Sequence, residues 1–278
     1  MSETLYLFDV SAYLHRAMYA CYRDAVDSVD PSNSAFIRYA TTLLASDMEL
    51  FQVKYMALVA DSTEPSLRCD MFSAYKAGRR DHPAVFRKQV PRFFQQMRDV
   101  SVAVLEEPRY EADDIIASTV LSRESCIAIV SLDKDLLAYV SNGDDGSPTV
   151  EHYNPLKREW SHVGDVEAKF QVTPEQLHDY IGLVGDSVDG IPGVRGIGPK
   201  TAAQLLRTFS SLEALYQATE AELRQHVSTR QVKLLSDGKA DAFLSRELAR
   251  PRISTRYATM PLSAYRAPSP NVVRGAIT

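Results

Sequence analysis

The sequence predicts an α/β protein with a mostly parallel central sheet and a helical C-terminal region. Three observations support this fold class. Four short apolar runs are rich in β-branched residues, helical patterns lie between them, and the pattern becomes almost wholly helical from about residue 172. Continuous apolar strands separated by helices are typical of a parallel sheet covered on both faces. A chain of 278 residues is long enough for one large core, or for a core with a smaller subdomain.

The elements of the first half follow from local patterns. The runs expected to be strands are Leu5–Phe8, Tyr55–Ala60, Val100–Leu105 and Cys126–Ser131. Apolar residues spaced three and four apart predict helices at Phe36–Phe51 and Asp113–Leu121. Turn-forming residues in nearly every position of Ser141–Pro148 predict a loop.

The second half begins with a clear helix start. Thr173 and Pro174 stand in the preferred N-cap and N1 order, and Gln176 completes a capping box before the apolar positions Leu177, Ile181 and Val184. Further helices are expected at Thr201–Phe209, Leu212–Ala218 and Val232–Leu248. From Pro261 the periodicity is lost and prolines gather, which predicts a tail or linker. We therefore expect a core over residues 1–168, a helical region over 169–260 and a tail over 261–278.

Composition narrows the class of protein. Apolar residues make up 45% and charged residues 24% of the chain, as in ordinary soluble domains. The N-terminus lacks the features of a signal peptide and no apolar run is long enough to cross a bilayer, so we expect a cytoplasmic protein. Three scattered cysteines argue against a disulfide framework or a thiolate zinc site.

The net charge of −5 is unusual for a protein that binds nucleic acid. The basic residues are concentrated, however, in the stretches Arg68–Arg98 and Arg195–Arg207. If the acids proposed below belong to a metal site, the remainder of the chain is net positive. The net charge therefore does not exclude DNA as a ligand.

The most informative feature is where the acidic residues fall. Asp9 ends the first expected strand and Asp61 the second. The others follow the third strand, the fourth strand and the first helix of the C-terminal region: Glu111, Asp113 and Asp114, then Asp133 and Asp135, then Asp186 and Asp189. Because the carboxyl ends of parallel strands meet at one edge of a sheet, we expect the strand-end acids to converge there.

So many carboxylates in one region need positive counter-charge. Taken singly, each also fits a turn or a helix cap, and acids in the first helical turn complement the helix dipole. Four clusters at the same end of one sheet favour metal binding instead. Oxygen ligands without His or Cys indicate two Mg²⁺ or Mn²⁺ ions rather than zinc. Two such ions roughly 4 Å apart activate water and stabilise the leaving oxygen when a phosphodiester is cut.

A glycine-rich stretch runs from Gly190 to Thr201. Its end places a glycine before a proline at the first position of a helix, with a basic residue next. Free backbone N–H groups at such a helix N-terminus bind phosphate, and the lysine adds charge. The other interpretation is a tight connection between two helices. The residues expected to bind DNA here are Gly193, Gly196, Gly198, Lys200 and Thr201.

The first basic stretch interleaves its charges with aromatic residues. Charge with aromatic rings suits single-stranded nucleic acid, which binds by ion pairing and stacking. The alternative is an amphipathic helix that packs aromatics such as Phe93 and Phe94 inward. Around Tyr75 that alternative is weaker, since Gly78 interrupts a helix. The basic residues are Arg68, Lys76, Arg79, Arg80, Arg87, Lys88, Arg92 and Arg98.

Five motifs occur together in the chain: LFDVSAYLHRAMYA, SLRCDMFSAYKAGR, YEADDIIA, SLDKDL and GDSVDGIPGVRGIGPKTAAQLL. With these motifs the sequence resembles the flap endonucleases and the 5′-nuclease domains of bacterial DNA polymerase I, from Leu5 to about Ile253. The resemblance implies a PIN-like core, an arch segment over about residues 64–98, and a helix–two-turn–helix element that grips duplex DNA. It also implies a monovalent ion such as K⁺ at those turns.

The resemblance implies roles for individual residues. Asp9, Asp61, Glu111, Asp113 and Asp114 match the acids around one metal ion, and Asp133, Asp135, Asp186 and Asp189 match those around the second. Lys76 and Arg79 match catalytic basic residues at the base of the arch, and Tyr75 matches an aromatic that stacks on a base. Arg68 and Arg80 are expected to contact DNA.

The function implied is that of a structure-specific 5′ nuclease of DNA replication and repair, monomeric, acting on 5′-flap, nicked or gapped DNA. No polymerase sequence follows residue 278, so we expect a stand-alone bacterial or phage-type nuclease or an isolated domain. Two alternatives remain: a junction-binding protein with weak catalysis, and an RNA-cutting relative. A phosphatase of the haloacid-dehalogenase type is set aside, because Ser11 stands where its second Asp is needed.

Three positions depart from the family pattern. Val10 replaces a common glycine and Gly190 a common asparagine, which predicts altered packing or turn geometry with catalysis intact. Pro91 interrupts the short arch segment, so we expect that segment to order on DNA binding rather than form a rigid arch.

Overall fold

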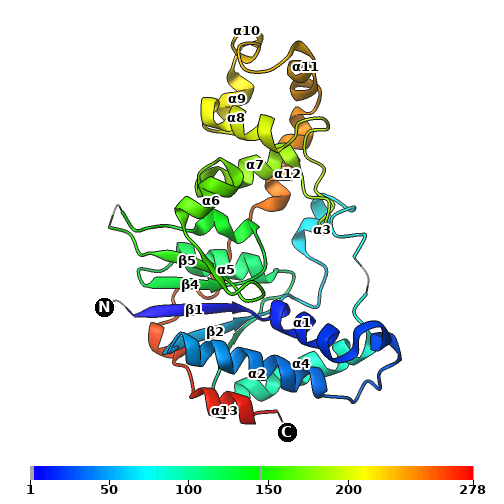
Figure 1. Cartoon of the computed structure of the whole chain (residues 1–278), viewed down its shortest axis with the longest axis vertical. Coiled ribbons are helices and arrows are strands. Elements are labelled where there is room, and N and C mark those ends of the chain that lie inside the picture. The colour runs from blue at the N-terminus through cyan, green and yellow to red at the C-terminus, as the bar shows by residue number, and fades with distance from the viewer. Residues whose placement is uncertain (1–2, 80, 145, 278) are drawn as a thin grey trace.

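A six-stranded sheet forms the centre of the protein, in the order β3-β2-β1-β4-β5-β6 (Figure 1). The computed structural model describes residues 3–79, 81–144 and 146–277. The strands are parallel except β6, which runs antiparallel to β5. Their bounds are β1 Thr4–Asp9, β2 Tyr55–Val59, β3 Ala103–Leu105, β4 Cys126–Val130, β5 Val150–Asn154 and β6 Glu159–Ser161. The four predicted strands are confirmed, whereas β5 and β6 were not predicted.

The strand order reverses at the centre of the sheet. From β1 the chain proceeds outward to β2 and β3, and then returns to place β4 on the other side of β1. At such a reversal the loops after the two central strands diverge and leave a crevice at the carboxyl edge. Asp9 ends β1 and Asp133 follows β4, so both lie beside this crevice.

Helices cover both faces of the sheet. On one face α1 (Val10–Tyr22), α2 (Ala35–Leu50) and α4 (Ala84–Asp99) pack against β-strand side chains such as Phe8 and Leu58. On the other face α5 (Ala112–Leu121) packs on Leu5 and other apolar strand residues. The predicted helices at residues 36–51 and 113–121 correspond to α2 and α5.

The segment expected to be interrupted at Pro91 is a continuous helix. Pro91 lies inside α4, where its ring removes one backbone hydrogen bond. The buried side chains Val85, Phe93 and Met97 hold the helix against the core and outweigh that loss. The amphipathic-helix interpretation of Phe93 is therefore correct, and the predicted break at Pro91 is wrong.

The helical region has a core of its own. Thr173 and Gln176 form the predicted capping box. The helix predicted over residues 232–248 is instead two helices that meet at Gly238, where a side chain would press on Val194. The elements are α6 Val163–Phe170, a 3₁₀ turn Pro174–Gln176, α7 Leu177–Val184, α8 Pro199–Phe209, α9 Leu212–Gln217, α10 Glu220–Leu223, α11 Thr229–Asp237 and α12 Lys239–Ala249.

The C-terminal segment packs against the core instead of forming a tail. Tyr265 lies in a 3₁₀ turn, Leu262–Tyr265, and is fully buried. Helix α13 (Pro270–Gly275) packs beside α2 and buries Val273 completely (Figure 1). The apolar residues of this C-terminal segment are few and widely spaced, so their pattern resembles that of a linker. Tyr265 and Val273 are nevertheless buried in the core.

The sheet and the helical region are joined near the crevice. The backbone N–H of Lys76 donates to the carbonyl of Asp189 (2.9 Å), which ties the segment after α3 (Leu67–Met71) to the loop after α7. Gly190 has a positive φ, and a side chain there would lie 2.8 Å from the Ala74 carbonyl oxygen. Within the described residues no helix is long and apolar enough to cross a membrane.

Gly193 lies where a side chain has no room. Its φ is +62°, and a Cβ would stand 2.5 Å from the Val184 carbonyl carbon. We expect Gly193→Ala to lower the free energy of unfolding by at least about 2 kcal/mol, since the left-handed conformation and the backbone overlap each cost about 1 kcal/mol or more. Urea unfolding measures this. Gly164→Ala, in α6 with open space around it, is the control and should be neutral or stabilising by up to about 1 kcal/mol. Equal effects in both variants would contradict the assignment.

Candidate active site

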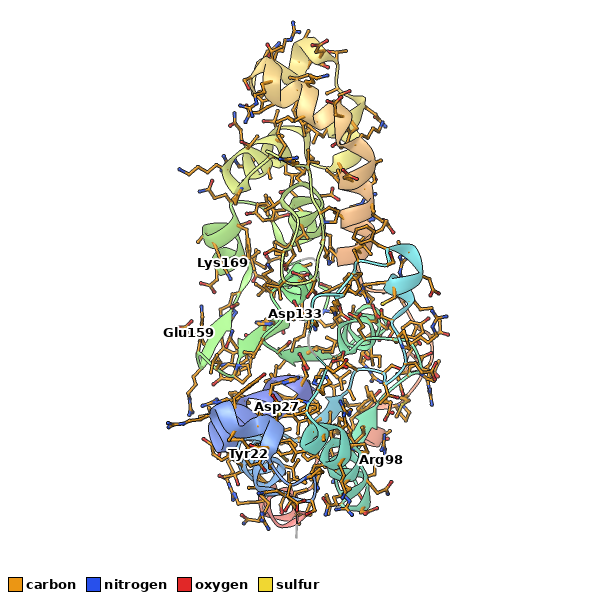
Figure 2. All side chains as sticks on the ribbon, turned by 90° about the vertical axis from the view of Figure 1, so that its right-hand side faces the viewer. Tyr22, Asp27, Arg98, Asp133, Glu159 and Lys169 are labelled. Carbon is orange, nitrogen blue, oxygen red and sulfur yellow. The ribbon has the colours of Figure 1, made fainter. Side chains whose placement is uncertain are left out.

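The crevice at the carboxyl edge of the sheet contains a cavity of about 400 Å³. In Figure 2 the labelled Asp133 lies at the height where the helical region meets the sheet. Two basic side chains, Lys76 and Arg79, also line the cavity. The sequence placed nine acids near this edge, and seven of them line the cavity: Asp9, Asp61, Glu111, Asp113, Asp133, Asp186 and Asp189.

Asp9 is held by the end of β1 and the start of α1. Its carboxylate accepts hydrogen bonds from the Ser11 backbone N–H (3.1 Å) and from the Ser131 hydroxyl (2.7 Å). Burial and repulsion from Asp61 raise the pKa of Asp9 to about 6, although the two serines act in the opposite direction. The group is therefore costly to ionise unless a cation is close.

The N-terminus of α5 presents the next acids. Glu111 is its N-cap and forms a capping box with Asp114. Asp61, from the loop after β2, accepts a hydrogen bond from the Ala112 N–H (2.8 Å). Burial, with repulsion from Asp114 and Glu111, raises the pKa of Asp113 well above its usual value despite the nearby Arg68. The positive end of the helix dipole favours negative charge here, yet it does not offset burial and repulsion, because the pKa of Asp113 is still raised.

Asp114 and Arg68 are turned away from the cavity. Arg68 is 0% exposed, and its guanidinium donates to both oxygens of Asp114 (2.7 and 3.0 Å). The remaining lone pairs of Asp114 are taken by the N–H groups of Glu111 and Arg252. The DNA contact predicted for Arg68 is therefore not supported, because the side chain is fully buried. Asp114 lies behind the acids that line the cavity.

Asp133 and Asp135 follow β4. The Asp135 backbone N–H donates to Asp133 (2.8 Å), and burial raises the pKa of Asp133. Burial and the Asp133 charge raise the pKa of Asp135 to about 8. Asp135 Oδ1 is buried and has no hydrogen-bond partner among the described residues.

Asp186 and Asp189 come from the loop after α7. Paired backbone hydrogen bonds between Asp186 and Ile191 fix this loop (2.7 and 2.9 Å). Lys134, between the two acids that follow β4, reaches across to Asp186 (Nζ–Oδ2 2.9 Å). Burial opposes the charge on Asp186, but Lys134 lowers its pKa. We did not single out Lys134 from the sequence, although its place between two predicted ligands was a usable signal.

The two predicted catalytic cations are bound to acids of the cavity. Lys76 Nζ lies 2.5 Å from Glu111 Oε2, and Arg79 pairs with Asp189. Tyr75 is only 4% exposed and donates its hydroxyl to Glu111 (3.0 Å). The ring cannot stack on a base from this position, so the structure does not support that role. Arg80 lies outside the described residues.

The donor set fits hard divalent cations. All seven acids offer oxygen, several have raised pKa values, and Asp135 carries an orphaned buried oxygen. As the side chains stand, no group of three or more acidic, His or Cys side chains in residues 3–79, 81–144 and 146–277 is arranged to hold an ion. Lys76, Arg79 and Lys134 form ion pairs with Glu111, Asp189 and Asp186 in this arrangement.

The glycine-rich turns divide into buried and exposed positions. The Gly193 N–H is buried and donates to the Ser245 hydroxyl (2.8 Å), so it is not available to a phosphate. Gly196, Gly198 and Lys200 are exposed, and Gly198 is the N-cap of α8 with Pro199 at N1. The Thr201 hydroxyl accepts a hydrogen bond from Gln231 (3.1 Å). The start of α8 is thus the part of this motif that is open to a ligand.

Both halves of the chain match models of one family. Residues 4–171 match the 5′-3′ exonuclease N-terminal resolvase-like domain, and residues 172–270 match the 5′-3′ exonuclease C-terminal SAM fold.

Curated relatives and a solved structure agree with this result. A 5′-3′ exonuclease of Aquifex aeolicus is 32% identical over 228 residues, which cover 80% of this chain and 75% of that protein. DNA polymerase I of Treponema pallidum is 34% identical over 256 residues, 88% of this chain but only 24% of the polymerase. The structure of a bacteriophage T5 flap endonuclease has a TM-score of 0.69 at 16% identity, covers 89% of each chain, and shows a likeness of fold. With its six-stranded sheet, acidic crevice and helical second half, the chain belongs to the 5′-3′ exonuclease family.

Proposed function

We propose that this chain is a metal-dependent 5′ nuclease that hydrolyses DNA at junctions between single and double strand, leaving a 5′-phosphate and a 3′-hydroxyl. The observation that carries the proposal is the convergence of seven acids from five chain segments on one cavity. The T5 flap endonuclease named above was solved as a pseudo-enzyme-product complex with DNA and metal ions.

The acids are assigned to two ions. Asp9, Asp61, Glu111 and Asp113 hold one divalent ion in this proposal. Asp133, Asp135, Asp186 and Asp189 hold a second. Such ions, when bound, lower the pKa of water and stabilise charge on phosphate oxygens. The carboxylates supply the ligands.

Lys76 and Arg79 stand at the rim of the same cavity and contact the scissile phosphate in this proposal. Their positive charge stabilises the negative charge that builds on the phosphate oxygens as the bond breaks. In the structure both pair with acids assigned to the metal ions, so the cations and the ions compete for the same oxygens. The exposed start of α8, with Lys200, binds a duplex phosphate through its N–H groups.

The substrate class is tested by cleavage of a 5′-labelled DNA flap, a nicked duplex and an RNA flap of the same sequence. We expect release of the DNA flap at its junction with Mg²⁺ and none with EDTA. Tight DNA binding without cleavage in Mg²⁺ or Mn²⁺ would support the junction-binding alternative. Preferred cutting of the RNA flap would support an RNA-directed nuclease.

The roles of the second group of acids are tested by Asp133→Asn and Asp186→Asn. We expect each to slow flap cleavage by roughly a hundredfold or more, while the Kd for the same DNA in EDTA changes little, because these side chains act on the bond being broken. Asp237→Asn, an exposed acid at the end of α11, is the matched control and should cleave normally. Parallel loss of binding and cleavage would refute the assignment.

The raised pKa values predict how metal-free stability depends on pH. Asp9 and Asp135 have folded pKa values of about 6 and 8, above the unfolded value of 3.8. Burial lowers the pKa of His15, His152 and His178 from 6.5 to about 4, so below pH 6.5 the histidines offset the acids, and only above it does the folded state hold more protons, through Asp135. In EDTA the free energy of unfolding should therefore fall by about 2 kcal/mol as the pH rises from 6.5 to 8. Mg²⁺ or Mn²⁺ should raise the melting temperature more at pH 8.5 than at pH 5.5, since protons and metal ions compete for these oxygens.

Thermal unfolding with and without metal measures this. Asp135→Asn should flatten the pH dependence in EDTA. A melting temperature that rises steadily from pH 5.5 to 8.5 in the metal-free protein would contradict the prediction.

A further inference from the structure

A second cavity, of about 230 Å³, lies on the other side of the segment that carries Asp133. Its walls come from the end of β4, the β5–β6 hairpin and α6, and include Trp160 and Val166. Leu132 and Lys134 line both this cavity and the acidic one. The two cavities are therefore neighbours separated by a single stretch of chain.

A buried histidine faces this second cavity without a partner. His152 is 3% exposed and lines the cavity from β5. The backbone of Asp133 lies beside the ring, but neither ring nitrogen has a hydrogen bond of normal geometry within the described residues. A neutral imidazole ring offers one N–H donor and one acceptor. Because buried polar groups almost always have partners, the ring is suited to hydrogen-bond a group that enters the cavity.

Three lysines line the cavity. Lys157 and Lys169 line it, and neither forms an ion pair among the described residues. The third lysine, Lys134, is already paired with Asp186. Burial lowers the pKa of Lys169, and repulsion from Lys157 and Lys134 adds to the effect, so the three ammonium groups lie within electrostatic range of one another.

Two acids also line the cavity, and neither neutralises these lysines by direct contact. Asp165 accepts a hydrogen bond from the His162 N–H (2.8 Å) and so caps the start of α6. Glu159 is exposed on β6 and lies on the same side of the molecule as Lys169 (Figure 2). With Lys134 paired to Asp186, two lysines and two acids remain in the lining, and no ion pair forms among these four described residues.

We propose that this second cavity binds a phosphate group, with Lys157 and Lys169 supplying charge and His152 donating a hydrogen bond. The volume is below the roughly 300–1,000 Å³ of pockets that enclose a whole small molecule, so a single phosphate fits better than a complete nucleotide. The phosphate belongs either to a nucleic-acid strand that passes the β5–β6 edge or to a free phosphate ion. Both sources present the same chemistry, and neither requires that the chain cleave DNA.

The first arm of the test uses orthophosphate and the whole chain in EDTA. The ring signals of His152, assigned by their loss in His152→Gln, are followed by NMR as phosphate is added. We expect a saturable shift that is weakened tenfold or more in the double variant Lys157→Ala/Lys169→Ala. The control Lys54→Ala/Lys233→Ala removes the same charge from exposed positions elsewhere and should bind phosphate normally.

The second arm measures DNA binding to a nicked duplex in EDTA at several salt concentrations. If a strand phosphate occupies the cavity, the slope of log K against log salt becomes shallower by about 1 in the Lys157/Lys169 variant and changes little in the control. A His152 shift with an unchanged slope assigns the cavity to free phosphate. The absence of both effects overturns the proposal.

Discussion

The buried Arg68 is the contact on which the arrangement of the site depends. Its guanidinium binds both oxygens of Asp114 and approaches Asp113 and Glu111, while its Nε and Nη2 donate to the carbonyls of Leu248 and Arg250. Burial alone disfavours the charged guanidinium, but the three carboxylates raise the pKa of Arg68, so the guanidinium stays ionised. One side chain therefore joins α3, the start of α5 and the end of α12. Removing one partner of such a group leaves an uncompensated buried charge, which costs several kcal/mol.

That contact also separates two kinds of acid that are adjacent in the sequence. Asp113 lines the cavity, whereas the carboxylate of Asp114 accepts hydrogen bonds from Arg68 and from two backbone N–H groups. The sequence predicts that both lie at the start of a helix, because strand and helix patterns are local. Which of the two faces the cavity depends on a guanidinium 45 residues away, and no local pattern contains that information. The same limit applies to Tyr75, whose hydroxyl donates to Glu111, 36 residues away, and whose ring packs in the core of the helical region.

The elements that local patterns predict well are those whose side chains are apolar on one or both faces. β1, β2 and β4 are continuous apolar runs, and their terminal acids follow directly from the parallel order of the strands. By contrast, β5 and β6 carry Glu151, His152 and Glu159, since an edge hairpin over a polar cavity does not need a fully apolar face. Helix α13 was missed for a related reason, because its stability comes from packing on α2 and not from its own pattern.

The cavity shows how an acidic site is kept folded without its ions. Seven carboxylates in about 400 Å³ repel one another, and Asp9, Asp113, Asp133 and Asp135 retain raised pKa values. Lys76, Arg79 and Lys134 each neutralise one acid from the rim, where a side chain can swing out without disturbing the core. Arg68 cannot do so, because it is enclosed on every side. The fixed cation thus belongs to the architecture. In the proposed function the three rim cations give way to metal ions and phosphate, and this division lets one set of acids serve both folding and catalysis.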